Sequence, residues 1–264
     1  MPRFAANLSL LFTELPLLQR IGAAAAAGFT AVEVQFPYSL PAQAWAQELA
    51  RHQLPLVLHN LPAGDWAAGE RGLACDPARR DEFRAGVAQA IEYALLLGTP
   101  RLNCLAGIAP PHLDAATARN CLLDNINWAA QQLGQHGLTL LIEAINTFDV
   151  PGFFLHHSQQ VFDLIGQCPF QNVLMQYDVY HMHRMGENVV ATLSQHLAHI
   201  GHIQIADAPG RHEPGSGEIN FASLFALLDQ AGYQNSGRSG WIGCEYQPSL
   251  STLTSLKWMA AATI

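Results

Sequence analysis

Lysine is almost absent from this chain of 264 residues, since Lys257 is the only one. A P-loop needs a lysine between glycine and serine or threonine, and Schiff-base chemistry needs a lysine desolvated in a pocket. Lys257 stands in "SLKW", on the expected outside of the last helix, so we expect neither chemistry. There is also no G-x-S-x-G nucleophile elbow and no H-E-x-x-H helix. Asn220 occupies the position of the third glycine that would complete a G-x-G-x-x-G loop.

Paired cysteines, long apolar runs and positive charge are scarce as well. The five cysteines are odd in number and lack C-x-x-C spacing, which indicates reduced thiols in a cytoplasmic protein, most of them in the core. No apolar stretch approaches the ~18–20 residues that cross a bilayer, and the first residues lack the order of a signal peptide. The net charge of -8 argues against nucleic acid as a partner. We expect a soluble protein without membrane or nucleic-acid partners.

Short apolar segments alternate with longer amphipathic segments along the whole chain. The expected strands are 3–8, 30–35, 55–60, 100–105, 138–144, 172–178, 200–206 and 240–246. The expected helices are 15–27, 41–52, 79–97, 114–135, 157–167, 187–198, 219–232 and 250–262. This alternation, with no Pro- or Ser-rich linker, predicts an α/β fold with a single (β/α)8 TIM barrel domain over residues 1–264. A doubly wound open sheet alternates in the same way and is the alternative.

Four expected strands carry an oxygen-bearing side chain near their ends: Glu143, Asp178, Gln204 and Glu245. Catalytic groups of a TIM barrel stand at the carboxyl ends of its strands, and neighbouring strands lie ~4.8 Å apart, so these side chains can converge. Three carboxylates held together would repel one another unless a divalent cation joined them. Oxygen ligands with room for water and substrate favour Mg²⁺ or Mn²⁺ over Zn²⁺. Taken singly, each residue could instead be a helix cap or a satisfied core amide.

Histidines and charged residues near the same barrel end form a second group of candidates. His59 and His181 follow or end strands, although each alone is more typical of a histidine bonded to a backbone carbonyl. Glu70 and Arg71 lie in the long glycine-rich segment 60–72, where they could cover the mouth or merely pair on the surface. Arg211 follows the seventh strand, where an arginine can bind a carboxylate through two hydrogen bonds. The net charge of -8 does not exclude a small anionic substrate, such as a hydroxy or oxo acid, because a few local cations would suffice.

Five segments resemble the hydroxypyruvate isomerases, a family of the xylose-isomerase-like TIM barrel superfamily. They are "LHNLPAGDWAAGERG", "LLIEAIN…DVPGF", "QYDVYHMHRM", "HIQIAD…GRHEPGSGEINF" and "GWIGCEY". The resemblance runs from "RFAANLSLLF" to "GCEY", which is nearly the whole chain. The 2-oxo-tetronate isomerases are similar too, but their equivalent of "LHNLPAGDW" reads differently.

The resemblance implies an isomerase that interconverts hydroxypyruvate and 2-hydroxy-3-oxopropanoate (tartronate semialdehyde) through an enediolate. It implies four ligands for a divalent metal, with Mg²⁺ expected and Mn²⁺ as the alternative: Glu143, Asp178, Gln204 and Glu245. Glu143 and Glu245 would also transfer the proton. The residues that it implies in substrate contact are His59, Glu70, Arg71, His181 and Arg211.

Two departures from the family pattern are visible, at Gln247 and in segment 234–240, and Gln204 differs from the wider superfamily. Most members of the wider superfamily have a histidine in place of Gln204, and an amide oxygen there favours Mg²⁺ over Zn²⁺. Gln247 stands where the family usually has a lysine, and segment 234–240 is longer than usual.

Several alternatives stay open at this stage. A 2-oxo-tetronate isomerase, or another small sugar-acid isomerase or epimerase, would use the same barrel. A metal-dependent phosphodiesterase like an apurinic-site endonuclease would need several Zn²⁺ ions and a basic face, which the net charge of -8 disfavours. A sugar-acid-binding protein without catalysis would not need both glutamates. A homo-oligomer is also open, since the sequence does not address oligomeric state.

Overall fold

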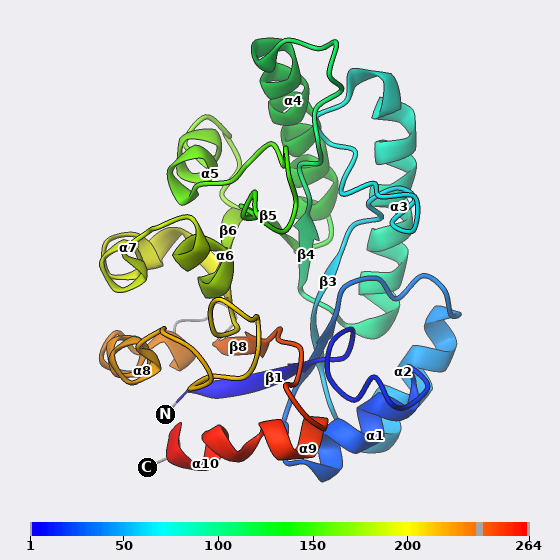
Figure 1. The fold of residues 1–264 in the computed structure, drawn as a ribbon. Coiled ribbons are helices and arrows are strands. Elements are labelled where there is room, and N and C mark those ends of the chain that lie inside the picture. The colour runs from blue at the N-terminus through cyan, green and yellow to red at the C-terminus, as the bar shows by residue number, and fades with distance from the viewer. Residues whose placement is uncertain (1, 236–239, 263–264) are drawn as a thin grey trace.

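A computed structural model describes residues 2–235 and 240–262, and it forms a closed barrel of parallel strands (Figure 1). The strands pair in chain order, and the last pairs with the first. They are β1 (Arg3–Asn7), β2 (Val32–Val34), β3 (Leu56–Asn60), β4 (Arg101–Cys104), β5 (Thr139–Glu143), β6 (Val173–Asp178), β7 (Ile200–Ile205) and β8 (Trp241–Cys244). The predicted (β/α)8 barrel is therefore confirmed, and an open sheet is wrong.

Helices surround the barrel in the order of the strands that they follow (Figure 1). The α-helices are α1 (Gln19–Ala26), α2 (Ala42–His52), α3 (Arg80–Leu97), α4 (Ala115–Gly134), α5 (Ser158–Ile165), α6 (Val179–Arg184), α7 (Val189–His196), α8 (Phe221–Gln230), α9 (Thr252–Ser255) and α10 (Lys257–Ala262). Short 3-10 turns are η1 (Pro77–Arg79), η2 (Leu197–His199) and η3 (Tyr233–Asn235). Among the described residues, no helix has the length and apolar character to span a membrane.

Three helical segments differ from the sequence-based expectation. The helix expected over 15–27 begins only at Gln19, and the one expected over 250–262 is divided into α9 and α10. Helix α6 was not predicted at all. It starts directly after β6 because the Asp178 carboxylate accepts the backbone N–H groups of Tyr180 and His181, which caps the first turn. The middle of the expected longer segment 234–240, residues 236–239, lies outside the described residues.

Most of the apolar core lies between the barrel and the helices, as a TIM barrel requires. A small second cluster involves residues of β1, β3 and β5: Ala5, Ala31, Val57, Leu58 and Leu141. Four of the five cysteines are buried, which confirms their expected place in the core, and Lys257 is exposed as expected.

Strand register decides which polar side chains meet at the carboxyl end of the barrel. Glu143 of β5 is paired with Gln176 of β6, and Asp178 of β6 is paired with Gln204 of β7. Gln204 is paired in turn with Gly243 of β8. Residues in register on neighbouring parallel strands lie side by side, so β5 to β8 hold these positions next to one another.

Candidate active site at the carboxyl end of the barrel

The four strand-end residues predicted from the sequence all lie at one end of the barrel. Glu143 and Asp178 are the last residues of β5 and β6, Gln204 belongs to β7, and Glu245 directly follows β8. Each is at most 4% exposed. Burial of three carboxylates in one place is costly unless they are hydrogen-bonded, protonated or bound to a cation. Their partners therefore show what the site is built to hold.

Gln176 of β6 connects two of these residues. Its Nε2 donates to Glu143 Oε2 at 3.0 Å and to Gln204 Oε1 at 2.6 Å. Asn103 of β4 donates to the same Glu143 oxygen at 2.8 Å. The side-chain oxygens of Gln176 and Asn103 are buried without a hydrogen-bond partner in the described structure. Glu143 is thus held by neutral amides, and unpaired oxygen atoms remain beside it.

Asp178 offers one carboxylate oxygen to the backbone and one to the site. Oδ1 accepts from the N–H groups of Tyr180 at 2.8 Å and His181 at 3.3 Å. Oδ2 is buried without a hydrogen-bond partner among the described residues, 3.6 Å from His181 Nε2 and 3.8 Å from Arg211. A buried carboxylate oxygen in this condition is costly, and a cation or a ligand donor would satisfy it.

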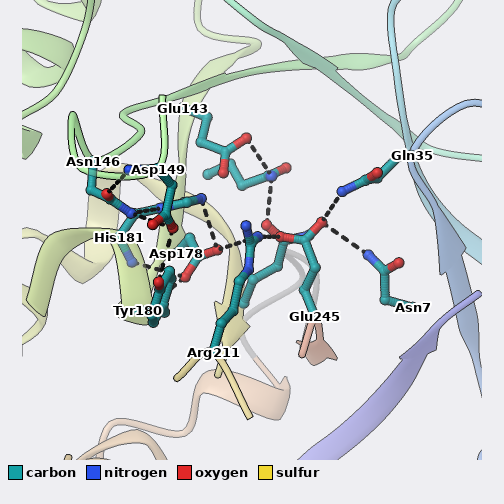
Figure 2. A network of polar contacts seen from close by, with 12 residues as sticks. Asn7, Gln35, Glu143, Asn146, Asp149, Asp178, Tyr180, His181, Arg211 and Glu245 are labelled. Atoms are coloured by element: carbon teal, nitrogen blue, oxygen red, sulfur yellow. Dashed lines mark hydrogen bonds and ion pairs between the residues drawn. The ribbon is translucent and has the colours of Figure 1, made fainter. Parts of the chain in front are cut away.

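Glu143, Asp178 and His181 are close enough to share one ion. Each offers one ligand atom, and these atoms lie within 4.8 Å of one another. Glu245 is not part of this set, although the sequence placed it among the ligands. Instead, it accepts a hydrogen bond from Arg211, which lies between Asp178 and Glu245 (Figure 2). The structure therefore brings two of the predicted ligands together and adds a histidine beside them.

The tautomer of His181 follows from its neighbour Asn146. Asn146 Oδ1 accepts from the backbone N–H groups of Phe148 and Asp149, and Nδ2 donates to Asp149 Oδ2 at 3.0 Å, so the amide cannot be reversed without losing these bonds. Its second amide hydrogen therefore meets His181 Nδ1, 2.6 Å away. Burial lowers the pKa of His181 to about 4, so the ring is neutral and Nε2 carries the hydrogen. His181 thus presents a donor to the site, which suits substrate contact better than metal ligation.

His59, at the end of β3, has the opposite arrangement. Tyr38 donates its hydroxyl hydrogen to the Asn60 carbonyl at 2.5 Å, and His59 Nδ1 contacts both that carbonyl, at 3.3 Å, and the Tyr38 oxygen, at 3.1 Å. Nδ1 must therefore carry the hydrogen. Burial lowers the pKa of His59 to about 4, so Nε2 is a buried acceptor, and the described structure gives it no partner. A ligand hydroxyl is the group that it would accept.

Glu245 is surrounded by donors from three elements (Figure 2). Arg211 donates to Oε2 at 2.9 Å. Oε1 accepts from Asn7 of β1 at 3.1 Å and from Gln35, just after β2, at 2.9 Å. This position closes the site between the first and last strands of the barrel.

The segment after β7 holds Arg211 in place over the site. Asp207 accepts four backbone N–H groups from residues 208–219, which folds this segment back on itself. Arg211 adopts a left-handed conformation with φ 56°, which is uncommon for a residue other than glycine. The backbone N–H of Gln247 donates to the Arg211 carbonyl at 2.8 Å, while the Gln247 side chain is exposed. Glutamine in place of the family's lysine at 247 therefore leaves this support intact.

Glu70 and Arg71 contact residues that are close to them in the chain. Arg79 binds the Glu70 carboxylate at 2.6 and 3.2 Å, and the Arg71 guanidinium lies 4.1 Å from the ring centre of Trp66. In the described part of the chain, neither has a hydrogen bond or ion pair to the four strand-end residues. Their contact with substrate stays a prediction.

Burial and neighbouring charges raise the pKa values of two acids in the site, Glu143 and Glu245. Burial, together with the negative charges of Glu245 and Asp178, raises the pKa of Glu143 well above its usual value. Burial raises the pKa of Glu245 to about 7, against the attraction of Arg211. For Arg211 itself, burial lowers the pKa, but Glu245, Asp178 and Glu143 outweigh it and leave the pKa raised. Shifts of this kind in one pocket are typical of catalytic acids and bases.

These shifts predict how the stability of metal-free protein depends on pH. Glu245 has a pKa of 4.5 as a free side chain and about 7 when folded, so the folded state binds more protons between these values, and stability falls as pH rises through them. His59 and His181, lowered from 6.5 to about 4, have the opposite effect up to pH 6.5. We therefore expect Tm, measured in chelator, to fall above pH 6.5.

Glu245→Gln isolates this carboxylate. The difference in Tm between the wild type and this variant should decline from pH 4.5 to above pH 7, and the histidine contributions cancel in that difference. A difference that stays flat or rises over this range would contradict the assignment.

The residues that support the site from below were not predicted from the sequence. They are buried polar residues of β1, β2, β4 and β6: Asn7, Glu33, Asn103 and Gln176. Glu33 carried the same signal that singled out Glu143, a lone acid within the apolar segment "TAVEVQ", and could have been found by it.

Comparisons with known proteins place this barrel. A family model described as the xylose isomerase-like TIM barrel matches residues 21–262. The chain belongs to this family. Within the xylose isomerase-like TIM barrel family, it is 47% identical over 259 residues to the hydroxypyruvate isomerase of Escherichia coli (strain K12), with 98% of each chain covered. It is 43% identical to the 2-oxo-tetronate isomerase of Cupriavidus necator over the same shares. The chain is an isomerase.

Two solved structures have the same fold as this chain. A protein from Brucella melitensis described as an AP endonuclease of family 2 has a TM-score of 0.94 and 42% identity, with 99% of each chain covered. The 3-keto-D-glucoside 4-epimerase of E. coli has a TM-score of 0.80 at 18% identity, with 99% of each chain covered, which shows the fold alone.

The donor set of the site fits a divalent cation. Asp178 Oδ2, Gln176 Oε1 and Asn103 Oδ1 are buried oxygens without a hydrogen-bond partner in the described structure, and Glu143 and Asp178 crowd two carboxylates together. Oxygen-rich sites of this kind suit Mg²⁺ or Mn²⁺. Which metal binds, and through which residues, belongs to the proposal that follows.

Proposed function

We propose that this isomerase acts on small sugar acids and interconverts hydroxypyruvate and 2-hydroxy-3-oxopropanoate with a divalent metal, Mg²⁺ in the first instance and Mn²⁺ as the alternative. The observation that carries the proposal is the pair of buried glutamates, Glu143 and Glu245, whose pKa values are both raised, with Arg211 beside one of them. The likeness to hydroxypyruvate isomerase at 47% identity supports the three-carbon substrate.

Glu143, Asp178, Gln204 and Glu245 would hold the metal. A divalent cation there would supply the positive charge that acidifies the C–H bond between the carbonyl and hydroxyl oxygens of the substrate and that offsets the charge of the enediolate. Glu245 would join this set when the substrate draws Arg211 away from it. In this exchange the substrate carboxylate would take the place of Glu245 beside Arg211, and the metal would take the place of Arg211 beside Glu245.

The proton moves between the glutamates and two neighbouring carbons. In hydroxypyruvate, C3 loses one of its protons and C2 receives one, while the hydroxyl on C3 gives up its proton and the oxygen on C2 gains one. One glutamate removes the first proton as its ionised form, and the other, or the same one, returns a proton to C2. A carboxyl group can take both roles, and burial raises the pKa of the Glu245 carboxyl group in the metal-free protein, which makes it a stronger base than a free glutamate.

The groups around the glutamates match the polar atoms of a hydroxy acid. Arg211 can bind the substrate carboxylate through two hydrogen bonds. His181 Nε2–H can donate to a substrate oxygen, and His59 Nε2 can accept from a hydroxyl. Glu70 and Arg71 remain proposed contacts from segment 60–72. A site with the Arg211 guanidinium, one neutral donor (His181) and one neutral acceptor (His59) suits an acid better than a neutral sugar.

The test compares two substrates with the purified protein. After metal is removed and Mg²⁺ or Mn²⁺ is added back, we expect a higher kcat/KM on hydroxypyruvate than on 2-oxo-tetronate, and no turnover of either in chelator. Higher efficiency on the four-carbon acid would make 2-oxo-tetronate the substrate. This acid is tested because the chain is 43% identical to a 2-oxo-tetronate isomerase. Equal turnover in chelator would contradict the metal.

An endonuclease activity, which the description of the Brucella melitensis protein would suggest for that protein, is less well supported here. The proposed ligand set rests on oxygen atoms, and the net charge of -8 repels a phosphate backbone.

A further inference from the structure

Glu33, in the middle of β2, is a fully buried carboxylate that the mechanism does not use. Its Oε2 is paired with His202 Nε2 at 2.7 Å. Its Oε1 accepts from Asn7 Nδ2 at 2.9 Å and from Gln204 Nε2 at 2.8 Å. Burial of the Glu33 carboxyl group away from water is costly, which indicates a role beyond packing.

The barrel leaves room for this carboxylate by having glycine at position 243. A Cβ added to Gly243 would lie 2.3 Å from Glu33 Oε2, so any larger residue in that register position of β8 would displace the acid. Strands β1, β2, β7 and β8 therefore all contribute to one specific position for the Glu33 side chain.

The bond from Glu33 decides which way the Gln204 amide faces. Glu33 Oε1 accepts a hydrogen bond from Gln204 Nε2, so the NH₂ group of the Gln204 amide faces Glu33. The carbonyl oxygen Oε1 is then turned the other way, where it accepts from Gln176 Nε2, the same group that binds Glu143. Without Glu33, the amide could rotate by half a turn and present an NH₂ group, which cannot bind a cation.

A second bond extends the influence of Glu33 to the other side of the site. Asn7 Nδ2 donates both to Glu33 Oε1 and, at 3.1 Å, to Glu245 Oε1. Figure 2 shows Asn7 reaching Glu245 from β1. Glu33 thus restrains two of the proposed ligands, Gln204 directly and Glu245 through Asn7.

We propose that Glu33 is a positioning residue that fixes the Gln204 amide with its oxygen toward the metal. This inference rests on the proposed function, since it requires that Gln204 binds the cation. It assigns to Glu33 the choice of oxygen over nitrogen at Gln204, the one proposed ligand that carries an amide instead of a carboxylate.

The test measures Mn²⁺ affinity directly, by titration followed with electron paramagnetic resonance, independently of turnover. Glu33→Met removes the acceptor and should weaken Mn²⁺ binding by about 10–100-fold, the usual effect of losing a partner of a metal ligand. Asn125→Leu is the matched control. It removes a buried amide that donates to the Ala74 carbonyl from helix α4, and it should leave Mn²⁺ affinity unchanged even if it lowers Tm.

A second substitution separates orientation from general damage. A carboxylate has an oxygen at both ends, so Gln204→Glu has no wrong orientation. It should raise Mn²⁺ affinity at least about tenfold in the Glu33→Met background, but not in the wild type, where it would face the Glu33 carboxylate. The same effect in both backgrounds, or Glu33→Met binding Mn²⁺ as tightly as the wild type, would overturn the inference.

The wild-type protein keeps the inference falsifiable if Glu33→Met does not fold. Neutron diffraction from crystals grown with Mn²⁺ should show Gln204 Oε1 bound to the ion and its NH₂ group still directed at Glu33. A reversed amide, or Gln204 away from the ion, would overturn it. Wild-type protein that binds no Mn²⁺ at all would overturn the proposed function as well, whereas failure of the variants alone affects only Glu33.

Discussion

Glu143→Gln and Glu245→Gln are each expected to lower kcat on hydroxypyruvate by about 10²–10⁴-fold, the range for loss of a general base. Glutamine keeps the shape and one carbonyl oxygen but cannot accept a proton. The substitution should lower kcat and leave KM nearly unchanged, because Arg211 binds the substrate carboxylate whether or not the glutamates can transfer protons. Measurement under saturating metal separates this effect from a loss of metal affinity. A variant that keeps more than about a tenth of wild-type kcat would contradict its role as a base.

Exchange of hydrogen with solvent distinguishes the two glutamates. In D₂O, the residue that removes the proton from C3 should be needed for deuterium to enter unreacted hydroxypyruvate, as nuclear magnetic resonance can follow. The other residue should be needed for deuterium to enter 2-hydroxy-3-oxopropanoate at its C2. If one variant abolishes both exchanges and the other abolishes neither, a single glutamate transfers the proton in both directions.

The strand ends of this fold could be predicted because two signals coincide in the sequence. Apolar segments of the right length occur at regular intervals, and the polar residues at the ends of four of them must lie at one end of a closed barrel. Glu143, Asp178, Gln204 and Glu245 were found in this way. Glu33 was overlooked because it lies mid-strand in the first half of the barrel, although an acid inside "TAVEVQ" is as costly as one inside "LTLLIEA".

Other features have too weak a signal in the sequence to be predicted. Helix α6 is formed by the cap that Asp178 provides, and six residues are too few for a clear helical period. The tautomer of His181 depends on how Asn146 is bonded to backbone N–H groups in its own loop. For Glu70 and Arg71, the sequence left open whether they cover the mouth or pair on the surface, and their partners here are Arg79 and Trp66. The orientation of these side chains depends on their particular partners, which the sequence pattern does not show.

Asp178→Asn should produce the largest loss of metal affinity of any single change in the site. The substitution keeps an oxygen for the backbone N–H groups of Tyr180 and His181, so α6 stays capped. It replaces Oδ2, the buried oxygen without a hydrogen-bond partner in the described structure, with an NH₂ group. Loss of a charged ligand should exceed the ~10–100-fold cost of losing an outer partner, so we expect Mn²⁺ binding to weaken by about 10²-fold or more.

The metal-free variant should be as stable as the wild type or more so, because removal of one carboxylate relieves the repulsion that raises the pKa of Glu143. Calorimetry in chelator and with Mn²⁺ measures both effects in one experiment: the wild type gains Tm on metal addition, and the variant does not. Asp114→Asn is the control, since Asp114 caps α4 by the same bond, to Thr117 N at 2.8 Å, but lies outside the site. It should keep the full metal-dependent gain. Asp178→Asn removes the carboxylate oxygen Oδ2, which lies near Glu143, His181 and Arg211. If this variant keeps the metal-dependent gain in Tm as well, the ion is bound elsewhere.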